Sequence, residues 1–262
     1  MNLVEEFYNK FNEDKRLNSR HGRVEYILSM EYIHKYLPAN RPKGEIKIAD
    51  IGAGTGRYSI PLFEEGYDVT AVELVNYNLG IMKQKCPALH ALKGNATNLK
   101  RKLKDDTYDV TLLFGPMYHL CSAEDKMKAL AEAKRVTKPG GVILVAYIMN
   151  EYMLLTYSFV EQHILEVKEK HRLTEDYNIV PHEKNIYYGV RIEEIDHFNQ
   201  TVGGVQREVI FSPDGPANHM RQVLNALSEE EFEIFVDYQR KTCERADLIG
   251  AGGHTVDVLR KI

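Results

Sequence analysis

The chain has 262 residues, of which 44% are hydrophobic and 27% charged, and its formal net charge is -4. This length and balance are typical of one globular α/β domain with insertions, and they argue against a disordered or fibrous protein. Because the net charge is negative and no long run of Lys and Arg is present, we expect no bulk nucleic-acid binding.

The three cysteines, Cys86, Cys121 and Cys243, are far apart and show no metal-ligand spacing. The first residues lack the basic and then apolar pattern of a signal peptide, and no run of about 18 apolar residues occurs. We therefore expect a reduced, cytoplasmic protein with no metal and no membrane contact. Nothing in the sequence indicates the oligomeric state.

The N-terminal segment, residues 2–37, is predicted to be helical because apolar residues recur at three-to-four spacing until Pro38. Short apolar runs then alternate with helical stretches. This alternation predicts a parallel sheet with helices on both faces. The expected strands are 46–51, 68–74, 89–93, 108–114 and 142–148, and the expected helices are 58–65, 76–85, 98–103 and 124–136.

The pattern changes after the fifth strand. Residues 150–172 predict a long amphipathic helix rich in aromatic residues, and a helix at 192–199 precedes strands at 205–211 and 255–259. Between those two strands, Ser228 and Glu231 have the spacing of a capping box that begins another helix. We interpret residues 1–262 as a single domain. Its expected parts are an N-terminal helical lid (1–40), a cofactor-binding core (41–148), and helical insertions (149–190 and 212–250) that cover the acceptor.

A glycine-rich turn follows the first expected strand, in the sequence IADIGAGTGRY of residues 48–58. Arg57 stands where a dinucleotide-binding fold has its third glycine, which argues against NAD. Glu73 ends the second strand, where an acid that binds ribose hydroxyls is expected. A tight turn and a solvated acid would explain the two features singly, but their combination in this order indicates a nucleoside cofactor.

These segments resemble the class I S-adenosylmethionine-dependent methyltransferases. Residues 48–58 resemble motif I of that family, 69–74 resemble its next motif, and Gly94-Asn95-Ala96 resembles its Gly-Asp-Ala. The resemblance is strong over residues 46–148, where Lys138-Pro139-Gly140-Gly141 precedes the fifth strand. It implies a Rossmann-like α/β fold with a seven-stranded, mostly parallel sheet in the order 3-2-1-4-5-7-6. The GPMYHL segment, residues 115–120, looks most like a subgroup with small-molecule acceptors.

The resemblance also implies a cofactor, S-adenosyl-L-methionine, which leaves as S-adenosyl-L-homocysteine. Glu73 would hold the ribose, Leu74 would pack on the adenine, and Asn95 with Ala96 would meet the adenine edge. Asn95 replaces the usual Asp, and a role as a turn residue remains an alternative for it. The full set of implied cofactor residues is Asp50, Gly52, Ala53, Gly54, Glu73, Leu74, Asn95, Ala96 and Gly115.

On the acceptor side, Tyr118 and His119 are the candidate catalytic residues, with His119 either a base or structural. Gly115 stands where amino-group methyltransferases of DNA and protein glutamine carry Asn or Asp, so that chemistry is not expected. Tyr8, Arg20 and His21, from the N-terminal segment, are expected to line the same pocket, although packing or exposure also explains each of them.

Together these features predict methyl transfer to the oxygen or nitrogen of a small molecule by direct in-line displacement. The sequence leaves two alternatives open. One is an RNA or protein methyltransferase, and the other is a regulatory protein that binds the cofactor without catalysis.

Overall fold

The computed structural model describes residues 19–262. It contains a seven-stranded sheet in the order β3-β2-β1-β4-β5-β7-β6. Neighbouring strands from β1 to β5 are parallel, and β7 is antiparallel to both β5 and β6. The predicted fold class and strand order are therefore confirmed. The strands are β1 (Lys47–Ile51), β2 (Asp68–Glu73), β3 (His90–Lys93), β4 (Tyr108–Leu113), β5 (Thr137–Ile148), β6 (Val205–Phe211) and β7 (His254–Lys261).

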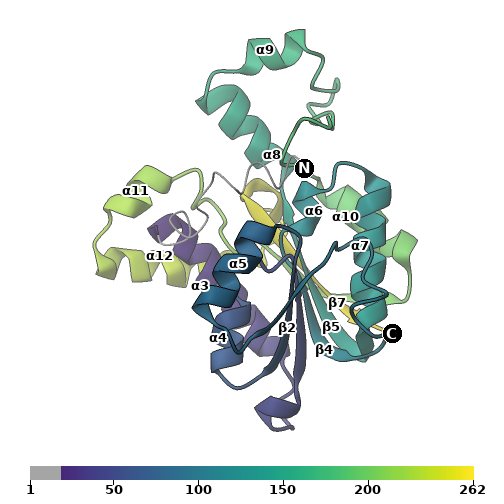
Figure 1. Ribbon diagram of the computed structural model, residues 1–262. Coiled ribbons are helices and arrows are strands. Elements are labelled where there is room, and N and C mark those ends of the chain that lie inside the picture. Colours follow the sequence, from purple (N-terminus) through teal and green to yellow (C-terminus); the bar gives the residue numbers. More distant parts are fainter. Residues whose placement is uncertain (1–18) are drawn as a thin grey trace.

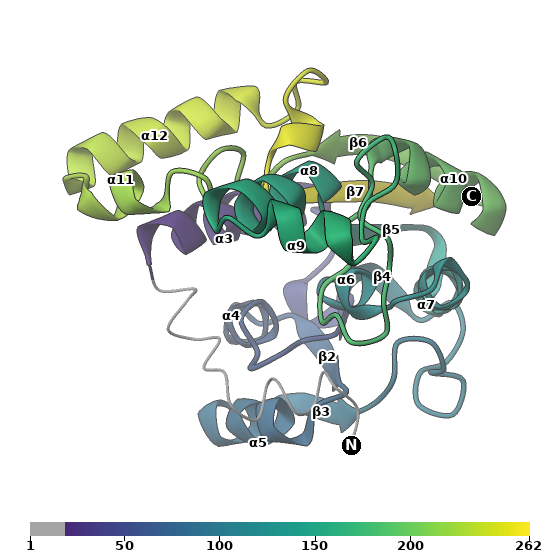
Figure 2. The same ribbon diagram turned by 90° about the horizontal axis from the view of Figure 1, so that it is seen from above.

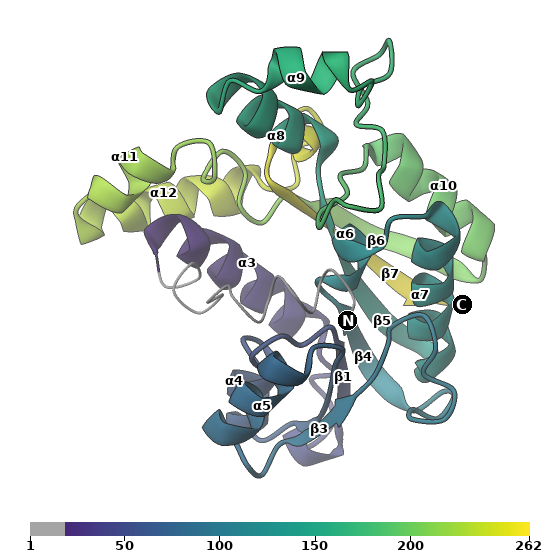
Figure 3. The ribbon, with the colours of Figure 1, turned by 45° about the horizontal axis from the view of Figure 1, so that its top comes forward.

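Helices cover both faces of this sheet (Figure 3). On one face lie α3 (Arg20–Tyr36), α4 (Ser59–Glu64) and α5 (Asn76–Lys85), and on the other lie α7 (Ala123–Val136) and α10 (Ile192–Val202). Successive residues of a strand point to opposite faces. Ile48 accordingly belongs to the apolar core on the face of α3, α4 and α5, and its neighbour Ala49 belongs to the core on the face of α7 and α10.

Helix α3 is part of the core layer. Its Val24, Leu28 and Ile33 are fully buried, and the ring of Tyr32 stacks on that of Phe211 at 3.7 Å between centroids. This description differs from the helical lid expected over residues 1–40, because α3 packs directly against the sheet. The first part of the expected helix, up to residue 18, lies outside the described residues.

Two helical insertions extend the core. The first follows β5 and consists of α8 (Asn150–Met153), a π-helical turn (Leu154–Val160) and α9 (Ile164–Glu169). The single helix expected over 150–172 is therefore broken into short pieces. Figure 1 shows this insertion above α6 (Pro116–His119), at the carboxyl ends of the parallel strands.

The second insertion, between β6 and β7, contains α11 (Arg221–Ala226) and α12 (Glu229–Thr242) and lies along α3 (Figure 2). The predicted capping box begins α12. Ser228 Oγ accepts a hydrogen bond from the Glu231 amide at 3.2 Å, and Glu231 accepts one from the Ser228 amide at 2.7 Å. Short 3₁₀ helices complete the described part at Lys43–Glu45 and Ile249–Ala251.

The helix predicted at 98–103 does not form, and this segment consists of turns. The Glu132 carboxylate on α7 accepts a hydrogen bond from the Leu99 amide at 2.6 Å. A tertiary contact therefore binds a backbone amide of this short segment. Within residues 19–262, no helix combines the length and the apolar character needed to cross a membrane.

Candidate functional site

A cavity of about 190 Å³ opens at the carboxyl ends of the parallel strands, where β1 and β4 lie side by side. In open α/β sheets, ligands bind at this edge. All nine residues that the sequence predicts for the cofactor line this cavity, together with Tyr118 and His119. The cofactor set is Asp50, Gly52, Ala53, Gly54, Glu73, Leu74, Asn95, Ala96 and Gly115.

The glycine turn after β1 has positive φ angles at Gly52 (86°) and Gly54 (56°). A Cβ on Gly52 would lie 2.4 Å from Cδ of Pro116 and 2.8 Å from the carbonyl oxygen of Phe114. The loops after β1 and β4 are therefore in direct contact, and residue 52 must be glycine. A Cβ on Gly54 would meet no atom within 4 Å, which leaves room for a ligand against the backbone.

Glu73 is buried, with 5% of its surface exposed. Its Oε2 accepts a hydrogen bond from the Gly54 amide at 2.8 Å, and its Oε1 accepts one from the Val75 amide at 2.7 Å. Burial raises the pKa of Glu73, and these backbone hydrogen bonds oppose that rise. The Asn78 side chain and the Leu74 amide also hydrogen-bond to this carboxylate. It therefore organises the turn, and ligand hydroxyls would share its two oxygens with these donors.

Asp50 is fully buried at the end of β1. Its Oδ2 accepts a hydrogen bond from Ser59 Oγ at 2.5 Å, whereas its Oδ1 has no hydrogen-bond partner among the described residues. Burial raises the pKa of Asp50 to about 7. Because buried acceptors are nearly always paired, an unpaired oxygen on a residue that lines the cavity fits a ligand that donates hydrogen bonds, such as an ammonium group.

Asn95 serves as a turn residue. Its Oδ1 accepts hydrogen bonds from both the amide and the hydroxyl of Thr97, each at 3.0 Å. These bonds use the two lone pairs with which Oδ1 was expected to meet the adenine amine. Of the two interpretations that the sequence left open, the geometry supports the turn.

The acceptor side of the cavity contains Tyr118 and His119 on α6, which begins after Gly115 (φ 105°). Their rings lie 4.9 Å apart, and they form a cluster with Tyr187 and His254. The Nδ1–H of His119 donates to the backbone carbonyl oxygen of Ile186 at 2.9 Å. The two predicted catalytic side chains are therefore brought together at the cavity.

Arg20 and His21 do not line the cavity. Arg20 pairs with Glu229 at 3.3 Å, and His21 Nδ1 lies 3.2 Å from the Asn225 side-chain oxygen, so both bind the second insertion. Their expected place in the substrate pocket is corrected accordingly, and Tyr8 lies outside the described residues. Further along α3, the residues that line the cavity are Glu25 and Ser29.

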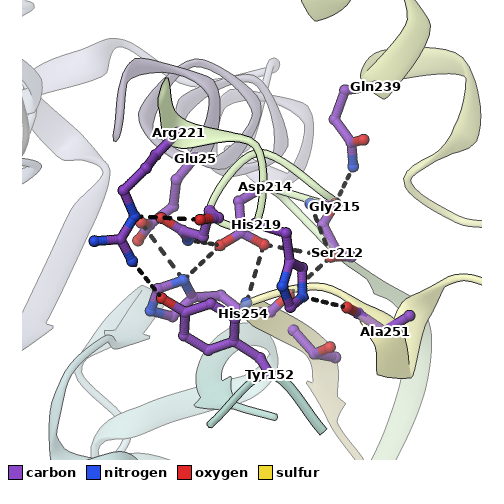
Figure 4. Close-up of polar contacts among 12 residues, drawn as sticks. Glu25, Tyr152, Ser212, Asp214, Gly215, His219, Arg221, Gln239, Ala251 and His254 are labelled. Carbon is purple, nitrogen blue, oxygen red and sulfur yellow. Dashed lines mark hydrogen bonds and ion pairs between the residues drawn. The ribbon is translucent and has the colours of Figure 1, made fainter. Parts of the chain in front are cut away.

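Sequence reasoning also missed a buried acid and a histidine at the cavity edge. Asp214 follows β6, and His254 is the first residue of β7 and lines the cavity. Figure 4 shows the two side chains facing each other. The signal was present, because an antiparallel last strand returns its first residue to the edge where the other strands end.

Comparisons with known proteins agree with this geometry. Residues 49–145 match the family model described as a methyltransferase domain. A demethylmenaquinone methyltransferase of Renibacterium salmoninarum is 39% identical over 101 residues, which cover 38% of this chain and 40% of that relative. A malonyl-[acyl-carrier protein] O-methyltransferase of Serratia marcescens is 38% identical over 98 residues, 37% of this chain and 36% of the relative. The chain thus matches about two fifths of the length of these curated relatives.

A solved structure from Thermotoga maritima, described as an S-adenosylmethionine-dependent methyltransferase and possible histamine N-methyltransferase, covers 99% of this chain and 98% of its own. Its TM-score is 0.58 at 23% identity, a likeness that shows the fold. Residues 49–145 therefore match a methyltransferase domain, and the described part of the chain has the fold of solved S-adenosylmethionine-dependent methyltransferases, as the sequence motifs predict.

Proposed function

We propose that this protein transfers a methyl group from S-adenosylmethionine to an oxygen or nitrogen of a small molecule. The observation that carries the proposal is the convergence of the predicted cofactor residues on one cavity. Two features of that cavity suit this cofactor. The unpaired Oδ1 of Asp50 can accept from its ammonium group, and the open side of Gly54 admits a ligand against the backbone.

The bound cofactor would supply a methyl group already activated by a sulfonium. The protein's own residues then have three tasks, which are to hold the donor, to align the acceptor and to exclude water. We assign the ribose hydroxyls to Glu73, which lines the cavity beside the glycine turn. Leu74 and Ala96 offer apolar surface for the adenine.

A small acceptor is favoured by the side chains that line the site. Aromatic rings of Tyr58, Phe114 and Tyr118 line the cavity, as do polar groups of His119 and His254. An apolar cavity with a few convergent polar groups is typical of small-molecule sites. The relative from Renibacterium is named for demethylmenaquinone, a small molecule, which also supports a small acceptor. We assign Tyr118 and His119 to the acceptor side.

Calorimetry tests the cofactor. We expect S-adenosylmethionine and S-adenosylhomocysteine to bind the purified chain and NAD not to bind, because Arg57 occupies the third dinucleotide glycine position and its guanidinium lies 4.2 Å from the centroid of the Tyr26 ring. Tight binding of NAD with no response to either sulfur ligand would overturn the proposal. A screen for tritiated methyl transfer into a metabolite library would then identify the acceptor.

A further inference from the structure

The sheet topology brings Asp214 and His254 to the cofactor edge. Because β7 is antiparallel, its first residue His254 pairs with Ile148, the last residue of β5. Strand β6 ends at Phe211, which pairs with Val256, so the loop that carries Asp214 begins at the same edge. Two segments 40 residues apart in the sequence thus meet beside Tyr118.

The two side chains form a tight pair. His254 Nδ1 lies 2.7 Å from Asp214 Oδ2, and the Asp214 side chain has no exposed surface. The backbone amide of His254 donates to Asp214 Oδ1 at 2.9 Å, and Asn218 Nδ2 donates to Oδ2 at 2.7 Å. Ser212 Oγ also donates to Oδ1 at 3.5 Å. The carboxylate is therefore held by four donors, and it fixes the plane of the imidazole (Figure 4).

This contact determines what the imidazole can do. A carboxylate only accepts hydrogen bonds, so Nδ1 carries the proton and Nε2 carries the lone pair. The same carboxylate stabilises the positive imidazolium that forms when Nε2 takes up a proton. His119, on the same cavity, differs because its Nδ1–H donates to a neutral carbonyl oxygen at 2.9 Å. Of the two histidines, His254 is the better supported base.

Other groups near His254 indicate which acceptor the site favours. The carboxylate oxygen Oε2 of Glu25, on α3, lies 3.6 Å from His254 Nδ1, and the Tyr118 ring centroid lies 6.0 Å from that of His254. Two carboxylates therefore face one imidazole at the cavity edge. Their negative charge disfavours an acceptor that is itself a carboxylate and favours a neutral or cationic one.

We propose that His254 is the general base for methyl transfer and that Asp214 is its positioning residue, an inference that rests on the proposed methyltransferase function. The acceptor is a neutral hydroxyl or a protonated amine. Nε2 of His254 takes the proton from the acceptor oxygen or nitrogen, whose electron pair forms the bond to the methyl carbon. The carbon–sulfur bond breaks with its electron pair remaining on sulfur, and the imidazolium later releases its proton to water.

The main alternative to a general base is a metal site, because single ligand atoms of Glu25, Asp214 and His254 lie within 4.8 Å of one another. The geometry favours the hydrogen-bonded pair. A metal on Nδ1 of His254 would displace the proton that bridges the 2.7 Å contact, and Asp214 Oδ2 already accepts from Asn218. Metal dependence is therefore an outcome that would contradict the proposal.

The first experiment needs no acceptor. Long-range ¹H–¹⁵N spectra of the full chain, labelled at histidine and bound to S-adenosylhomocysteine, report which ring nitrogen carries the proton. In the neutral imidazole of His254, we expect the proton on Nδ1 and not on Nε2. We expect this preference to be weaker in Asp214→Asn. The opposite tautomer in the parent protein would overturn the proposal.

The second experiment uses acceptors found by the tritium screen. His254→Asn keeps a donor toward Asp214 but has no base, so we expect turnover to fall by about 10²- to 10⁴-fold, with S-adenosylhomocysteine affinity changed less than twofold. His254→Ala should recover turnover when imidazole is added. His219→Asn is the matched control, because the exposed His219 contacts the Ala251 carbonyl oxygen at 3.2 Å outside the cavity.

Three results would contradict this role. They are unchanged turnover in a folded His254→Asn variant, carboxylic acids as the preferred acceptors, or turnover lost on EDTA treatment and restored by a divalent metal. The failure of the proposed function is distinguishable, because in that case the parent protein itself would bind neither S-adenosylmethionine nor S-adenosylhomocysteine.

Discussion

The carboxylate of Glu73 and the amide of Gly54 are 2.8 Å apart, so the acid that ends β2 holds the glycine turn that follows β1. Strands β1 and β2 are neighbours in register, with Ile51 opposite Val72. Their loops are therefore coupled by a side chain as well as by the sheet. A ligand bound to Glu73 would therefore contact the same carboxylate that holds the glycine turn in place.

The first prediction concerns this carboxylate. Glu73→Ala removes the acceptors for the Gly54 and Val75 amides as well as for a ribose, so both cofactor binding and stability should decrease. We expect cofactor affinity to fall by about 2 to 4 kcal/mol, and Glu73→Gln to lose about half as much because one acceptor oxygen remains. Calorimetry with S-adenosylhomocysteine and thermal unfolding measure the two effects.

Asp68→Asn, at the opposite and exposed end of β2, is the matched control and should change neither quantity. A Glu73→Ala variant with the affinity and melting temperature of the parent protein would mean that the Glu73–Gly54 hydrogen bond contributes to neither cofactor binding nor stability.

The second prediction separates packing from ligand access in the glycine turn. Gly52→Ala would force Cβ within 2.4 Å of Pro116, whereas Gly54→Ala meets no atom within 4 Å. We expect Gly52→Ala to unfold at a markedly lower temperature. Gly54→Ala should lose only about 1 to 2 kcal/mol of stability from its positive φ, yet bind S-adenosylhomocysteine at least tenfold more weakly. Equal melting temperatures for the two variants would contradict the assigned packing.

Much of this site was predictable because its chemistry lies in short, ordered motifs. The glycine turn, Glu73 and the GPMYHL segment each follow a strand that the apolar pattern identifies, and parallel strands bring such segments to one edge. All nine predicted cofactor residues accordingly line the cavity. Local sequence was sufficient there because each residue acts directly after its own strand.

Contacts between distant segments were not predictable in the same way. Arg20 pairs with Glu229, 209 residues away, and no periodicity in either segment indicates that partner. Asn95 turned its oxygen toward Thr97, two residues along, a local alternative that the family motif obscured. Asp214 and His254 were missed because neither belongs to a motif. The available signal was the direction of the antiparallel last strand, which brings them together.

The third prediction concerns stability at the antiparallel edge, where two ion pairs join β6 and β7. Asp257 is fully buried and bound by Arg207 at 2.7 Å, and it also accepts from Asn199 at 2.6 Å. The second pair, Arg260 with Glu208 at 2.5 Å, is partly exposed. Asp257→Asn should lower the free energy of unfolding by about 2 to 3 kcal/mol, because Arg207 and Asn199 lose a charged acceptor while Arg207 keeps Asp196 at 2.7 Å.

Glu208→Gln should cost less than about 1 kcal/mol, as exposed pairs do. Urea titration of both variants compares them, and similar losses would show that burial does not distinguish the two pairs.

The last prediction concerns pH and Asp50, whose pKa burial raises to about 7. Because this value lies above that of an unfolded aspartate, the folded protein without ligand keeps a proton that the unfolded chain has lost. The contribution of Asp50 to the free energy of unfolding therefore falls as pH rises from about 4 to about 7, and it is constant above pH 7. Cofactor binding should follow the opposite trend, since the ammonium of S-adenosylhomocysteine favours the ionised carboxylate.

We therefore expect the affinity for S-adenosylhomocysteine to rise with pH between 5.5 and 7, by up to about tenfold per unit, and to level off above. Glu73 borders the same cavity and also has a raised pKa, so its titration must be separated. Adenosine serves this purpose because it retains the ribose and lacks the ammonium, and its affinity should show only the contribution of Glu73. Asp50→Asn should bind S-adenosylhomocysteine more weakly and reduce its pH dependence to that of adenosine. If the two ligands show the same pH dependence in the parent protein, Asp50 does not hold the ammonium group.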